Sequence, residues 1–99
     1  MPAYILAIRK RVTDPEEMAK YGALAMKSPF PAGYRLLAMG GKFEALEGGP
    51  VDGVILAEFP SYEAAKAWYN SEEYQKAAAH RHKGSEFDFL VVEGLPPRE

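Results

Sequence analysis

Three segments of this chain have the alternating side-chain pattern of β-strands. In each of them, both sets of alternating positions include apolar residues, so neither set is polar throughout. In residues 54–59, for example, Val54 and Leu56 alternate with Ile55 and Ala57. Successive side chains of a strand point to opposite faces of the sheet, so both faces of the predicted sheet carry apolar residues. Each face then needs a cover that keeps water away from it.

The remaining segments supply helices for one of these faces. Residues 13–27 begin with Thr13 or Asp14 as the capping residue and with Pro15 in the first turn. Residues 61–84 begin at the cap Ser61 and break at Asn70, before a second cap at Ser71. Strands are predicted at residues 3–12, 34–39, 42–46, 52–59 and 86–93.

The resulting order, β-α-β-β-β-α-α-β, contains the β-α-β-β-α-β arrangement of a ferredoxin-like fold. The predicted class is therefore α+β, with an antiparallel sheet and its helices on one face. Residues 1–95 form one domain and residues 96–99 a tail. In a chain of 99 residues, the expected cover for the second face is another copy, which predicts a homodimer.

Composition excludes several classes of function. The net charge of −2 lacks the basic excess of a nucleic-acid-binding protein. No apolar run reaches membrane-spanning length, and the N-terminus lacks a signal-peptide pattern, so we expect a cytoplasmic protein. There is no Cys, hence no disulfide and no Cys-based zinc site. Asn70 and Gln75 are the only side-chain amides, and Pro occurs 8 times, a thermophile tendency.

The sequence resembles the bacterial family grouped as domain of unknown function 1330, over about residues 3–95. The resemblance rests on "VTDPEEMAKY", on "GGKFEALEG" and above all on "LAEFPSYEAAKAWYNSEEYQKAAAHR". It implies the ferredoxin-like fold of the dimeric α+β barrel superfamily and a homodimer, but no particular reaction. Two positions depart from the family pattern: Met39 precedes the Gly-Gly pair, and His82 follows Arg81 where the family often has a second Arg.

Arg81 is the first candidate for a ligand-binding residue. It follows Tyr74, Ala77 and Ala78 at helical spacing, so it shares their apolar face. A guanidinium there needs a carboxylate, carbonyls or an anionic ligand, although a structural role near the helix end is the more common explanation. Glu58, at the end of an apolar strand, is the expected partner, and the two are predicted to line one polar pocket that accepts an anion.

Glu58, His80 and His82 are the candidate catalytic bases. Two residues apart on a helix, the histidine rings point to opposite sides, so no shared metal site is predicted, nor any cofactor. Trp68, Tyr74 and Tyr21 belong to an aromatic group for which core packing is the leading explanation, although a tyrosine hydroxyl could orient a ligand.

Three functions remain open at this point. The first is a protein that binds a small molecule, anionic or aromatic, in the cavity of a dimeric barrel. The second is a cofactor-free enzyme of the monooxygenase or isomerase type, with Glu58 or a His as the base and Arg81 stabilising an anion. The third is a structural or partner-binding dimer. Neither nucleic acid nor a membrane is an expected partner.

Overall fold

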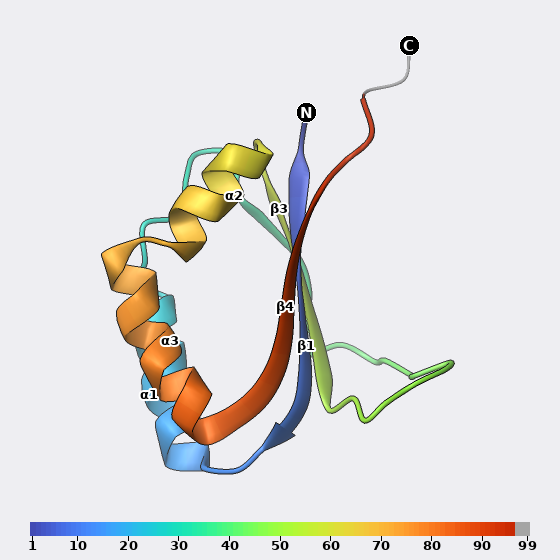
Figure 1. Ribbon diagram of the computed structural model, residues 1–99, viewed down its shortest axis with the longest axis vertical. Coiled ribbons are helices and arrows are strands. Elements are labelled where there is room, and N and C mark those ends of the chain that lie inside the picture. Colours follow the sequence, from blue (N-terminus) through green and yellow to red (C-terminus); the bar gives the residue numbers. More distant parts are fainter. Residues whose placement is uncertain (97–99) are drawn as a thin grey trace.

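The computed structural model describes residues 1–96, so positions 97–99 of the predicted tail lie outside the described residues. The described residues form three helices and one sheet, and the helices lie on one side of the curved sheet (Figure 1). The elements are β1 (Ala3–Val12), α1 (Pro15–Ala25), β2 (Arg35–Met39), β3 (Gly53–Phe59), α2 (Tyr62–Tyr69), α3 (Glu72–Gly84) and β4 (Ser85–Glu93). The predicted α+β class with an antiparallel sheet and helices on one face is confirmed.

The sheet has the strand order β2-β3-β1-β4, and every neighbouring pair is antiparallel. In the centre of the sheet, Leu6 of β1 lies opposite Leu56 of β3 and Leu90 of β4. One position earlier, Ile5 lies opposite Ala57 and Val91, and these side chains point to the other face. Ile5 and Ala57 belong to the core that the sheet forms with the helices. Leu6, Leu56 and Leu90 therefore lie on the face that the helices do not cover.

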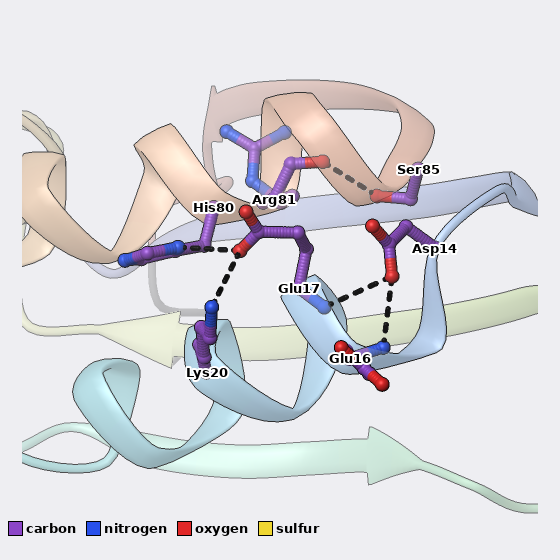
Figure 2. Close-up of polar contacts among 7 residues, drawn as sticks. All are labelled: Asp14, Glu16, Glu17, Lys20, His80, Arg81 and Ser85. Carbon is purple, nitrogen blue, oxygen red and sulfur yellow. Dashed lines mark hydrogen bonds and ion pairs between the residues drawn. The ribbon is translucent and has the colours of Figure 1, made fainter.

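The helices begin where the capping residues predict. The Asp14 carboxylate accepts hydrogen bonds from the backbone N–H groups of Glu16 and Glu17, as Figure 2 shows at the start of α1. The hydroxyls of Ser61 and Ser71 accept backbone N–H groups in the same way, at the starts of α2 and α3. The predicted break at Asn70 is confirmed, because α2 ends one residue before it.

The strand predicted at residues 42–46 is wrong. Residues 40–52 form a loop that extends away from the sheet on the side opposite the helices (Figure 1). A strand needs a neighbour for its backbone hydrogen bonds, and this segment has none within the described chain. Glycines with positive φ at Gly40 and Gly48 turn the chain at both ends of the segment.

The face of the sheet opposite the helices, which we call the outer face, is apolar as predicted. Leu90 is 51% exposed and Val92 is 56% exposed, so in one copy of the chain water reaches this face. Ion pairs lie along its border, including Lys10–Asp88 at 3.3 Å. None of the helices described for residues 1–96 is long and apolar enough to span a membrane. The apolar residues of the outer face are Tyr4, Leu6, Ile8, Val54, Leu56, Leu90 and Val92.

Candidate ligand cavity

A cavity of about 270 Å³ lies between the helices and the sheet. Seven of its sixteen lining residues are aromatic, and the others are aliphatic residues, methionines and one glycine. No Asp, Glu, His, Lys or Arg lines it among the residues that the structure describes. The volume is just below the range of about 300–1,000 Å³ that is typical of ligand sites. Its shape and lining suit a small apolar molecule.

The cavity exists because α1 packs on α3 rather than on the sheet. The backbone N–H groups of Thr13 and Asp14 both donate to the carbonyl of Gly84, which ties the start of α1 to the end of α3. Where α1 faces the cavity it presents the small residues Gly22 and Ala25 beside Tyr21, and the sheet contributes Ala7 and Ala57 among larger side chains. The four small residues fill little of the space between α1 and the sheet.

Two tyrosine hydroxyls meet at one wall of this cavity. The hydroxyl oxygens of Tyr21 on α1 and Tyr74 on α3 lie 2.9 Å apart, and both residues line the cavity. Burial raises the pKa of Tyr21 and of Tyr74, while the positive charge of Arg81 acts in the opposite direction. Both phenols are therefore neutral near pH 7 and can donate hydrogen bonds.

Arg81 lies behind this pair and does not line the cavity. Its side chain is on the buried face of α3, as the helical spacing predicts, and the residue is only 4% exposed. The guanidinium carbon lies 4.2 Å from the ring centroid of Phe89 and 5.9 Å from that of Tyr21. Nε and Nη2 are buried without any hydrogen-bond partner. Arg81 is thus a buried cation that the described protein leaves without a carboxylate.

The predicted pairing of Arg81 with Glu58 is wrong. Glu58 alternates with Ala57 and Phe59 along β3, and those two neighbours face the helices, so Glu58 points to the outer face. There its carboxylate lies 3.9 Å from Arg35 of the adjacent strand. The sheet therefore separates Glu58 from Arg81, and the two do not share a pocket.

The histidines also lie outside the cavity. Nδ1 of His80 lies 2.7 Å from the Glu17 carboxylate, across the contact between α3 and α1 (Figure 2). This hydrogen bond is the main cause that lowers the pKa of Glu17 below its ordinary value, and Lys20 adds to it. His82 is exposed to solvent, so the two rings do point to different surroundings, as their spacing predicts.

Trp68 is buried and lines the cavity, which brings three of the aromatic candidates, Trp68, Tyr74 and Tyr21, to one place. Its indole Nε1 donates a hydrogen bond of 2.9 Å to the hydroxyl of Ser28. The ring stacks at 5.5 Å on Phe30, which itself stacks at 4.3 Å on Tyr34. Sequence reasoning missed Phe30 and Tyr34 as cavity residues. The only signal was that both aromatic residues lie in the proline-rich segment between α1 and β2.

A family profile described as "Domain of unknown function (DUF1330)" matches residues 2–95 of the sequence. The chain belongs to the DUF1330 family. No curated protein has a significantly matching sequence. The DUF1330 assignment confirms the resemblance noted from the sequence and carries no known reaction with it.

Solved structures confirm the ferredoxin-like fold of this DUF1330 chain. The RPA0582 protein of unknown function from Rhodopseudomonas palustris is 24% identical, with a TM-score of 0.61 over 97% of this chain and 84% of that one. A dimeric ferredoxin-like protein of unknown function from Thermobifida fusca is 16% identical, with a TM-score of 0.62 over 94% and 91%. SnoaB, a cofactor-independent oxygenase from Streptomyces nogalater, is 14% identical, with a TM-score of 0.56 over 97% and 94%.

Proposed function

We propose that this protein binds a small aromatic molecule in the cavity between α1 and the sheet. The observation that carries the proposal is a cavity of about 270 Å³ whose lining includes seven aromatic residues and no charged ones. Aromatic side chains favour offset or edge-to-face contacts with a ligand ring. A single ring or a small fused pair suits a site of this size.

A cofactor-free enzyme is the second candidate. The shared fold with SnoaB is compatible with it, but fold likeness alone does not carry a reaction. Glu58, His80 and His82 all lie outside the cavity, so none of the three is placed to take a proton from a molecule bound there. Binding is therefore the function that the cavity supports best.

We propose further that two copies pair through their outer faces. Of the seven apolar residues on this face, Leu90 and Val92 are exposed and the other five are partly exposed, and contact with a second copy would remove them from water. The charges along its border are already paired within the chain, including Arg11 with Glu86 at 2.6 Å, so two copies can approach without strong repulsion. Several similar structures are described as dimeric, which supports the same arrangement here.

The binding proposal is tested with the chain's single tryptophan, because Trp68 lines the cavity. Nitrobenzene, a neutral aromatic quencher, should reduce Trp68 fluorescence with a saturable dependence on concentration. Gly22 also lines the cavity, and a Cβ added there meets no atom within 4 Å. Gly22→Leu should therefore fold and fill the cavity, whereas Gly22→Ala leaves most of it open.

The expected result is saturable quenching in the wild-type protein and in Gly22→Ala, with at least a tenfold weaker affinity in Gly22→Leu, equivalent to about 1.4 kcal/mol. Quenching that rises linearly without saturation in the wild type would refute binding. Equal affinity in Gly22→Leu would place the bound molecule elsewhere.

A further inference from the structure

The charge on Arg81 is not balanced by any protein group near it. On α1, the carboxylate of Glu17 is engaged by His80 and Lys20, and Figure 2 shows no dashed line from it to Arg81. On β4, the guanidinium faces the rings of Phe87 and Phe89. Ring faces attract a cation, but they do not satisfy its N–H donors. A buried cation of this kind attracts negative charge to its surroundings.

The Tyr21–Tyr74 pair has one hydrogen to spare. Two neutral phenols carry two hydroxyl hydrogens, and the 2.9 Å contact between their oxygens uses one of them. No acceptor for the other hydrogen is found among residues 1–96, and Arg81, whose guanidinium is close enough to lower the pKa of both hydroxyls, can only donate. One O–H donor therefore remains unused at the pair.

We propose that the cavity binds an aromatic compound in its anionic form, a phenolate or a conjugated enolate, with the charged oxygen at the Tyr21–Tyr74 pair. The inference rests on the binding function proposed above and narrows its ligand class. The free O–H donates to the anionic oxygen, and the Arg81 charge stabilises it from behind the pair. No base lines the cavity within residues 1–96, so the proton that the ligand loses goes to solvent.

The single free hydrogen distinguishes this anion from a carboxylate. A phenolate places its charge on one oxygen attached to the ring, which one donor and one nearby cation can match. A carboxylate brings two oxygens, and the second one would enter an apolar cavity without a donor. Leaving that oxygen unpaired costs about 1–3 kcal/mol or more. An aromatic carboxylate is therefore the disfavoured ligand.

The test uses 4-nitrophenol, because its neutral and ionised forms absorb at different wavelengths. The spectrum of the bound compound is recorded about one pH unit below the pKa of the free compound, where the free form is mostly neutral. The wild-type complex should show the phenolate band. This requires the pKa of the bound phenol to fall by at least about one unit, or tenfold in its ionisation constant.

Three variants separate the contributions. Arg81→Met should still bind neutral nitrobenzene as the wild type does, but should lose the phenolate band. Arg81→Lys, which keeps the charge, should retain part of it. The double variant Tyr21→Phe/Tyr74→Phe removes both hydroxyls, and with them the free hydrogen, and should also reduce the band. If Arg81→Met does not fold, Arg81→Lys and the double variant still test the proposal.

The outcomes distinguish this inference from the binding function. Nitrobenzene that binds while bound 4-nitrophenol keeps its neutral spectrum would overturn the anion site and leave the binding function standing. An unchanged phenolate band in Arg81→Met would also overturn it. Benzoate binding tighter than 4-nitrophenol would overturn the phenolate class. If neither neutral nor ionised compound binds, the binding function itself fails.

Discussion

The imidazole of His80 on α3 lies 2.7 Å from the carboxylate of Glu17 on α1, and this contact joins the two helices beside the cavity. The same helices are joined at one end by the backbone bonds from Thr13 and Asp14 to Gly84. The wall of the cavity that carries Tyr21 is therefore positioned by α3, and changes along the α1–α3 contact should alter both stability and binding.

Glu17 predicts a specific response to acid. Its pKa is lowered from the ordinary 4.5, so the folded protein binds this proton less readily than the unfolded chain does. The stabilisation that ionised Glu17 gives the folded protein is complete at pH values above this ordinary pKa. It is lost as the pH falls through the lower pKa that Glu17 has in the folded state. Between about pH 5 and pH 3, the wild type should lose more stability in urea unfolding than Glu17→Gln does. Glu16→Gln is the matched control, and parallel profiles for wild type and Glu17→Gln would contradict the prediction.

Two glycine substitutions should have opposite effects. A Cβ at Gly84 would lie 2.8 Å from the backbone oxygen of Asp14 and 2.9 Å from the Glu17 Cβ, so the two helices must move apart. We expect Gly84→Ala to destabilise the protein by about 1–3 kcal/mol, as overpacking does. Gly22→Ala meets no neighbour and should stabilise α1 by about 0.5–1 kcal/mol. Chemical denaturation measures both, and changes of equal sign would refute the packing described for Gly84.

Arg81→Met should leave the stability of the ligand-free protein unchanged or raise it. The substitution removes a buried cation that has no carboxylate partner and keeps a side chain of similar length. It also removes the cation–π attraction to the neighbouring rings, worth about 0.5–2 kcal/mol, which the relief of the buried charge offsets. A destabilisation of more than about 3 kcal/mol in urea unfolding would instead indicate a broken ion pair.

The outer face should control assembly. We expect sedimentation to give twice the 11.0 kDa chain mass for the wild type at micromolar concentration. Leu90→Arg places a charge in the apolar face, on the edge strand β4, and should give monomers, because obligate interfaces bury over about 2,000 Å² of mostly apolar surface. Leu95→Arg, at a residue 85% exposed and outside that face, is the control. A wild-type monomer would refute the pairing.

Thermal stability is predicted from composition alone. Two side-chain amides, no Cys and 8 prolines favour a melting temperature above roughly 80 °C, beyond the range of about 45–65 °C common for mesophilic domains. Calorimetry in dilute buffer tests this, and a cooperative transition below about 65 °C would contradict it.

Local signals predicted most of the fold. The caps at Asp14, Ser61 and Ser71 are short-range features, so they located the helix starts correctly. Helical spacing also placed Arg81 on the buried face. The segment 42–46 was misassigned because its strand-like composition does not show whether a neighbouring strand is available for pairing.

The candidate site was harder to predict because it depends on which face of the sheet the helices cover. Alternation separates Glu58 from Ala57, but in a strand with apolar residues on both faces it does not show which set faces the helices. The pairing with Arg81 was wrong for that reason. The cavity itself depends on α1 leaning on α3, which is a property of packing between distant segments.

Because α1 packs mainly on α3, its small sheet-facing residues contribute little to holding it in place. Local opening of α1 therefore disturbs the sheet very little, and its amides should exchange with deuterium sooner than those of the central strand β1. A molecule in the cavity would touch both walls at once. Its binding would then be reported by slower deuterium uptake in α1, with no change required in the sheet.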